Sequence, residues 1–179
     1  MNNIKQSKKI ALCGIISALS IAIMISAYFP YLTYAIPAMA GVLTVVLVVE
    51  LGVKWAFLSF GITAVLSALM CEKEAAVVYI LFFGYYPIIK YLLEKSRKPA
   101  FEYILKFLIF NVAAVAVFYI CSFVLGIGLE EFTGGIEYMI YVLLIAANVM
   151  FIVFDYALNR LISLYYHKYH PKISKIIKR

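Results

Sequence analysis

Long apolar stretches, separated by short polar segments, dominate the chain. Six of them are candidate membrane spans, over about residues 10–28, 35–51, 55–71, 75–93, 102–126 and 138–163. A helix of about 20 apolar residues crosses the hydrocarbon core of a bilayer. The pattern therefore predicts an all-α integral membrane protein, a bundle of six transmembrane helices that forms a single polytopic domain over 1–179. A basic tail at 164–179 follows the last span.

Composition supports this prediction. Hydrophobic residues make up 66% of the 179 residues and charged residues only 14%. A soluble domain has about 45–50% apolar and about 25% charged residues. Lipid is therefore the expected solvent of the fold.

The positions of Lys and Arg predict the orientation. If the N-terminus is cytoplasmic, six crossings return the C-terminus to the cytoplasm and place 15 of the 16 basic residues, Lys90 and Lys106 included, on that side. This is the bias that governs insertion. A five-span alternative, with 35–71 as a re-entrant pair, would scatter these charges. The net charge of +7 thus reflects topology and anionic headgroups, and we expect a multi-pass protein of the cell membrane with no nucleic-acid partner.

Acidic residues gather in two loops on the predicted outer side. The first loop carries E-K-E, at Glu72, Lys73 and Glu74, and the second carries Glu137 with two further glutamates. Acids contribute little to insertion, so topology does not require them there. They are either solvated loop residues or the polar part of a binding site.

Aromatic residues are dense toward the same side. Tyr31 lies in the first outer loop, and the outer halves of two spans carry Tyr79, Phe83, Tyr138 and Tyr141. Tyr belts at membrane interfaces explain such positions. Aromatic walls with a few polar groups also suit a small planar ligand, and the sequence leaves both interpretations open.

Small residues recur at every fourth position of the first span, at Gly14, Ala18, Ala22 and Ser26. This spacing places them on one helix face, where they let another helix approach closely in lipid. The face serves either packing within the bundle or docking to another membrane subunit.

Three polar residues, Asn111, Asn148 and Asp155, fall inside spans. Such residues usually face the bundle interior. We expect Asp155 to form a local cluster with Asn159 and Arg160 near the inner surface; an ion or proton pathway is the alternative, but no partner acid is evident.

Catalytic and metal-binding motifs are missing from the sequence. It has neither HExxH nor the phosphate-binding GxxxxGK, and its two histidines lie in the tail. We expect no enzyme, no metal site and no cofactor. Active transport would then need energy from a partner protein.

The layout resembles an S component, the substrate-binding membrane subunit of energy-coupling factor vitamin transporters. The resemblance covers nearly the whole chain: its size, six spans with both termini inside, and "KKIALCGIISALSIAI" at the first span. It implies partners, a coupling membrane subunit and two ATPase subunits. It also implies docking through Gly14, Ala18 and Ala22, although Gly14 departs from the strict Ala-x-x-x-Ala pattern.

The resemblance further implies a small vitamin-like ligand bound under the loops after the first, third and fifth spans. These loops read "YFPYLTY", "MCEKEA" and "GIGLEEFTGGIE". The residues expected to bind the ligand are Glu72, Lys73, Glu74, Tyr79, Phe83, Glu137, Tyr138, Tyr141 and Tyr31.

Two alternatives remain. The chain is also similar in size and hydropathy to rod-shape-determining membrane protein D, a scaffold without a substrate. A lone ion-coupled carrier that uses Asp155 and Asn148 is the third hypothesis.

Overall fold

The computed structural model describes residues 5–29, 32–95, 99–126 and 139–173. These residues form helices and contain no strand. The elements are α1 (Gln6–Ile25), the 3-10 turn η1 (Ser26–Tyr28), α2 (Ala35–Glu50), α3 (Val53–Met70), α4 (Lys73–Val78), the π-helical segment η2 (Tyr79–Phe83), α5 (Tyr86–Glu94), α6 (Pro99–Phe123), α8 (Met139–Leu164) and the π-helical segment η3 (Tyr165–Tyr169).

The helices have the length and polarity of a membrane protein. Five helical stretches of the described chain are long and apolar enough to cross a bilayer, and α2 is a shorter apolar helix of 16 residues. The predicted all-α membrane fold is thereby confirmed. The number of six crossings and the cytoplasmic termini stay predictions.

Glycine and proline set the breaks between helices. Gly52 has a φ of 90°, a conformation that suits glycine, and its N–H donates to the Leu47 carbonyl at 2.9 Å where α2 turns into α3. The expected fourth span is divided into α4, η2 and α5. Pro87 occupies the first turn of α5, where its missing N–H costs nothing. Proline thus starts a helix here instead of kinking one.

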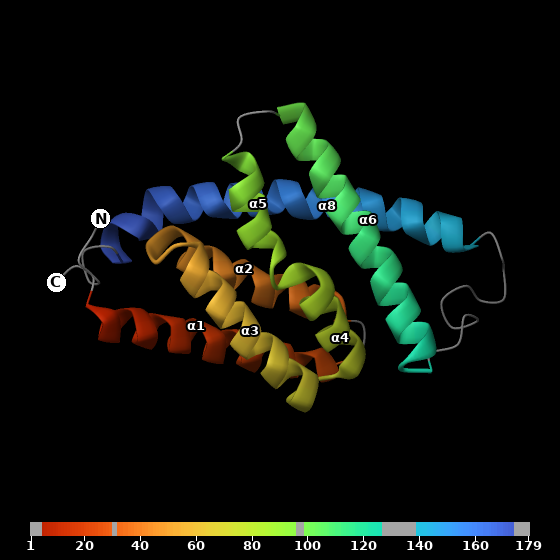
Figure 1. The fold of residues 1–179 in the computed structure, drawn as a ribbon, viewed down its shortest axis with the longest axis horizontal. Helices are drawn as coiled ribbons and strands as arrows, with labels where there is room; N and C mark the ends of the chain where they lie inside the picture. Colours follow the sequence, from red (N-terminus) through yellow and green to blue (C-terminus); the bar gives the residue numbers. More distant parts are fainter. Residues whose placement is uncertain (1–4, 30–31, 96–98, 127–138, 174–179) are drawn as a thin grey trace.

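Helices α1, α2 and α3 lie against one another (Figure 1). A seam of buried hydroxyl groups lies between them. Ser17 of α1 and Ser59 of α3 share a hydrogen bond of 2.7 Å, and Ser20 donates to the Ala40 carbonyl of α2 at 3.4 Å. Small side chains let helices approach closely in lipid. The face of α1 that packs inside the bundle is therefore the one with Ser17 and Ser20.

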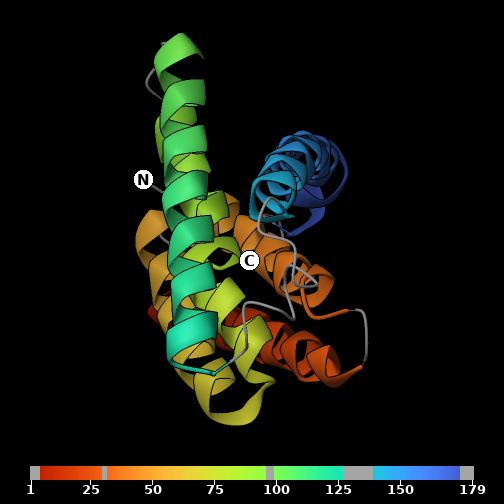
Figure 2. The ribbon, with the colours of Figure 1, turned by 90° about the vertical axis from the view of Figure 1, so that its right-hand side faces the viewer.

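An aromatic core joins α5, α6 and α8. Phe82, in η2, contacts Tyr86, Phe110 and Phe151, and the rings of Phe110 and Phe151 stack at 4.6 Å between centroids. Ring pairs of this kind add to the stability gained by burial. In Figure 2, α8 is viewed almost end-on at the edge of the molecule.

The start of α1 and the end of η3 lie at the same end of the molecule (Figure 1). The last turn of α2 is there too. Its Glu50 carboxylate accepts a hydrogen bond from the Tyr165 hydroxyl at 2.8 Å and lies 2.8 Å from His170 Nδ1. These contacts fasten the end of the last helix to α2.

Candidate functional site

Two polar groups of side chains stand out in the described structure. We call the first the Glu74 cluster (Tyr28, Tyr34, Glu72 and Glu74), at the loops after α1 and α3. We call the second the Asp155 network (Tyr86, Lys90, Glu94, Glu102, Lys106 and Asp155), between α5, α6 and α8. The sequence predicted part of the first and missed the second.

In the Glu74 cluster, Glu72 caps a helix. Its carboxylate accepts hydrogen bonds from the backbone N–H groups of Glu74 at 2.9 Å and Ala75 at 2.6 Å, the first free donors of α4. A side-chain oxygen at this position stabilises a helix start. The acidity of E-K-E therefore has a local structural use at Glu72, whereas Lys73 is exposed.

Glu74 connects the two loops. Its carboxylate accepts a short hydrogen bond from the Tyr34 hydroxyl, and the Tyr28 hydroxyl donates to the Met70 carbonyl at 3.2 Å. Burial, and then the neighbouring Glu74 carboxylate, raise the pKa of Tyr34. Cys121, near the end of α6, lies within electrostatic range of Glu74. Ends of three helical stretches thus converge around this carboxylate.

The other predicted ligand-binding residues that the structure describes are spread over different parts of the molecule. Tyr79 is 1% exposed in a core with Met24 and Ala40, whereas Phe83 packs against Phe154 in a different core. Tyr141 is 71% exposed on α8. Three further predicted residues lie outside the described part of the chain: Tyr31, Glu137 and Tyr138.

The small-residue face of α1 points away from the bundle. Gly14, Ala18 and Ala22 are exposed, Ser26 is half-buried, and a Cβ at Gly14 would meet no atom within 4 Å. The neighbouring face, with Cys13 and Ser17, makes the contacts to α3. The described structure therefore does not use this face for packing within the bundle.

The Asp155 network begins at a buried carboxylate. Asp155 Oδ1 accepts hydrogen bonds from the Tyr86 hydroxyl at 2.6 Å and from Lys90 Nζ at 2.5 Å, and Asp155 Oδ2 lies 3.6 Å from Lys106 Nζ. Tyr86 and Lys90 are completely buried, and Lys106 is 2% exposed. One carboxylate from α8 therefore meets positive groups from two other helices.

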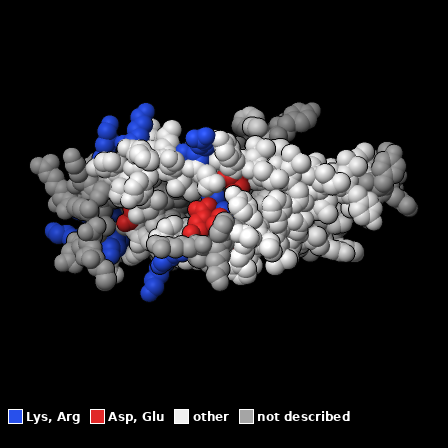
Figure 3. All heavy atoms as spheres, turned by 90° about the horizontal axis from the view of Figure 1, so that it is seen from above, with Lys and Arg blue, Asp and Glu red and all other residues white. Residues whose placement is uncertain are grey.

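Two glutamates close the network. Glu94 Oε1 lies 2.7 Å from Lys90 Nζ and 3.0 Å from Lys106 Nζ, and Glu102 accepts from Lys106 at 2.5 Å. Glu94 lies nearer the surface than Asp155: its side chain is 36% exposed, against 11% for that of Asp155. Viewed from above, acidic side chains gather near the centre of the molecule beside Lys and Arg, and the described surface to the right is white (Figure 3).

The sequence contained a signal for this network. Tyr86, Lys90 and Glu94 are four residues apart on α5, so they share one helix face. Our interpretation treated Lys90 and Lys106 as cytoplasmic surface charges instead. It also expected Asp155 beside Arg160, but Arg160 donates to the exposed Tyr156 hydroxyl at 2.8 Å. The partners of Asp155 lie on α5 and α6, which are distant from it in sequence. The periodicity of one helix does not reveal which other helices it contacts.

A second intramembrane polar contact joins α6 and α8. The side-chain amides of Asn111 and Asn148 exchange two hydrogen bonds, at 3.0 and 3.1 Å. The expectation that these residues face the bundle interior is consistent with this pair. It satisfies both amides where lipid offers no partner.

The chemistry available in these groups is ionic and hydrogen-bonding. Buried acids and lysines can hold helices together or exchange protons. Among the described residues, no three His, Cys, Asp or Glu side chains are grouped as metal ligands.

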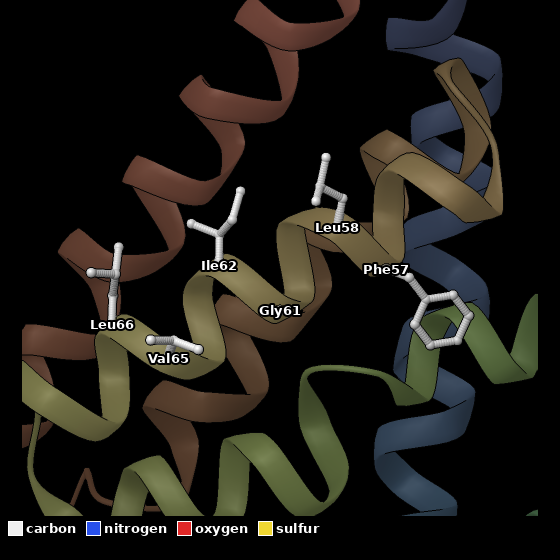
Figure 4. Close-up of a pocket in the computed structure, with 6 residues that line it drawn as sticks. All are labelled: Phe57, Leu58, Gly61, Ile62, Val65 and Leu66. Atoms are coloured by element: carbon white, nitrogen blue, oxygen red, sulfur yellow. The ribbon is translucent and has the colours of Figure 1, made fainter.

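An open apolar groove lies over Gly61 on α3 (Figure 4). Its volume is about 620 Å³. Figure 4 shows side chains fanning out from α3 around Gly61, and they belong to Phe57, Leu58, Ile62, Val65 and Leu66. All are apolar, so the groove suits a lipid tail and offers a polar ligand no hydrogen bond.

Comparison with known proteins adds no relative to this picture. No family model matches the chain, and no curated protein or solved structure is similar to it. Its function must be argued from the helices and from the two polar groups.

Proposed function

We propose that the protein is the substrate-binding membrane subunit, or S component, of an energy-coupling factor importer for a small vitamin-like micronutrient. In this proposal it has no catalytic activity and lies in the cell membrane with six spans and both termini in the cytoplasm. A coupling membrane subunit and two ATPase subunits supply the energy.

The observation that carries the proposal is the direction of the small-residue face of α1. Gly14, Ala18 and Ala22 are exposed, whereas α1 packs against α2 and α3 through a different face that carries Cys13, Ser17 and Ser20. In lipid, a face of small residues favours a close helix contact. A second membrane protein is the natural occupant of that contact, and S components use this face for their coupling subunit.

The Glu74 cluster supports the ligand-binding part of the proposal. Loops after α1 and α3 meet there through Tyr34 and Glu74, and in an S component the loops after the first and third spans contact the ligand. Glu74 is the more suitable ligand contact of the two acids, because Glu72 is already occupied as a helix cap.

Gentle purification of the tagged protein from its native membrane tests the proposal. Co-purification of one membrane subunit and two ATPases is expected. The variant Ala18→Leu should reduce their recovery by about tenfold, because it fills the small-residue face. Ala68→Leu, at an exposed alanine of α3, is the matched control and should not change it. Recovery of shape-determining proteins without ATPases would support the scaffold alternative instead.

The second candidate is an ion-coupled carrier, and the Asp155 network favours it. Charged residues inside a membrane protein often mark an ion or proton pathway. If the protein works alone, proteoliposomes that contain only this chain should show proton-linked uptake, and Asp155→Asn should abolish it. Absence of such uptake together with co-purified ATPases would exclude this candidate.

A further inference from the structure

The last long helix, α8, is attached to the rest of the bundle along one narrow stripe. Its buried residues are Phe151, Asp155 and Leu158. Asn148 precedes them by one helical turn, and Tyr165 follows in η3. The spacing of three, four, three and seven residues places all of them on one helix face. Most other described residues of α8 are exposed.

Polar contacts hold this stripe at three points. Asn148 bonds to Asn111 of α6, Asp155 bonds to Tyr86 and Lys90, and Tyr165 bonds to Glu50 of α2. Between the polar points α8 packs through four apolar side chains, Phe151, Phe154, Leu158 and Ile162. The contact therefore combines three polar points with an apolar stripe.

Lipid makes this distribution significant. Apolar contacts between helices gain little in a bilayer, because lipid tails cover an apolar face as well as another helix does. A charge in hydrocarbon, by contrast, needs its partner. The position of α8 must then depend more on its polar contacts than on the apolar stripe.

We propose that α8 is a latch helix, and that the Asp155 network is the lock that fixes its position against α5 and α6. When the pairing of Asp155 with Lys90 and Lys106 is broken, α8 moves as a unit while α1–α6 keep their arrangement. The latch does not depend on the proposed transport role, and it would serve a carrier or a scaffold equally.

Asp155 is the lock because its carboxylate makes most of the contacts. Both of its oxygens are used, and its three partners come from two helices. The Asn111–Asn148 pair is neutral, and the Glu50 contacts lie at the helix end. Loss of the Asp155 charge leaves both lysines with fewer partners in a place where water does not replace them.

Distance measurement between spin labels tests the latch in nanodiscs. Labels at Val112→Cys on α6 and Val149→Cys on α8 report the position of α8, since both positions are more than half exposed, at 63% and 55%. A reference pair, Leu69→Cys and Val112→Cys, reports the α3–α6 arrangement. The native thiols, Cys13, Cys71 and Cys121, are buried and should remain unlabelled.

A single narrow α6–α8 distance is expected in the otherwise native chain. Asp155→Asn, which keeps the shape and removes the charge, should lower the population of that distance by about twofold or more. Lys90→Gln, which removes the charge of the partner lysine, should also lower the population of the narrow distance. Asp155→Glu, which keeps the charge, should restore much of the narrow distance, and the exposed control Arg160→Gln should not change it.

The reference pair decides between a latch and general loosening. It should stay narrow in Asp155→Asn. If the α6–α8 distance stays narrow in both Asp155→Asn and Lys90→Gln, the lock is wrong. If the α3–α6 distance broadens equally, the network stabilises the whole fold and the latch is wrong as well.

Discussion

The Glu74 cluster and the Asp155 network contain similar side chains in opposite surroundings. Each joins carboxylates to a tyrosine hydroxyl. Tyr34 of the first is 53% exposed, whereas Tyr86 of the second is completely buried. Water screens and replaces contacts in the first case, whereas in the second it does not reach Tyr86 and Lys90.

The difference in burial decides how much a charged contact contributes to the stability of this fold. An exposed contact contributes little, because both partners find water when it breaks. A buried pair gains little in itself, but removing one partner leaves the other charge stranded. The Asp155 network should therefore govern how firmly α8 is held, and the Glu74 cluster is free to be adjusted for a ligand.

The largest expected effect is that of Lys90→Met. It removes a completely buried cation and leaves Asp155 and Glu94 to share Lys106. The free energy of unfolding should fall by about 3–5 kcal/mol. Thermal unfolding, followed by labelling of the buried Cys13 thiol, measures this loss.

The matched control for that variant is Lys73→Met at the exposed lysine of E-K-E. It should change the free energy of unfolding by less than about 0.5 kcal/mol. Equal effects of the two variants would remove the contrast between the two regions. The double variant Lys90→Met with Asp155→Leu should lose less than the sum of its single variants, because the stranded charge is then gone.

These residues also show what the sequence could predict. The apolar stretches gave the helices within a few residues, since a membrane helix is specified by length and polarity. Gly52 and the E-K-E acids marked real breaks. The division of the fourth span into α4, η2 and α5 was not expected, because a π-helical segment has no clear sequence signal.

The sites were harder to predict than the helices for a physical reason. Lys90 and Lys106 are near span ends, where a surface charge and a buried charge look alike in sequence. Only the three-dimensional crossing of α5, α6 and α8 pairs them with Asp155. Conversely, the small residues of α1 were found from their spacing, but spacing could not tell that Gly14 and Ala18 point outward.

A smaller effect is expected at the helix cap. Glu72→Ala should lower the free energy of unfolding by about 1 kcal/mol, because two N–H groups of α4 lose their acceptor. Glu72→Asn keeps a capping oxygen and removes the charge, so it should retain most of this stability. Thermal unfolding monitored at the adjacent Cys71 thiol measures both. An equal loss in the two variants would mean that charge, not capping, is what matters at Glu72.

The amide pair between α6 and α8 separates polarity from charge. Asn148→Ala should lower the free energy of unfolding by about 0.6 kcal/mol, the usual size of a hydrogen bond between membrane helices. The loss is small because Asn111 keeps its bond to the Phe107 carbonyl at 2.9 Å. Thermal unfolding of Asn148→Ala and of Lys90→Met, measured under the same conditions, compares the two losses of unfolding free energy. A loss as large as that of Lys90→Met would show that any polar contact of α8, charged or not, carries the same weight.

The smallest effect is expected at Tyr34. Tyr34→Phe removes an exposed hydrogen bond and should lower the free energy of unfolding by a few tenths of a kcal/mol, roughly the lower end for such bonds. Burial and Glu74 raise the pKa of Tyr34, so the folded protein favours the neutral hydroxyl. This contribution is complete below the ordinary tyrosine pKa of about 10 and is lost as pH rises above it. The stability difference between the native chain and Tyr34→Phe should therefore shrink in alkali, and it should shrink less in a Glu74→Gln background. A difference that grows with pH would mean that Glu74 does not hold the Tyr34 hydroxyl.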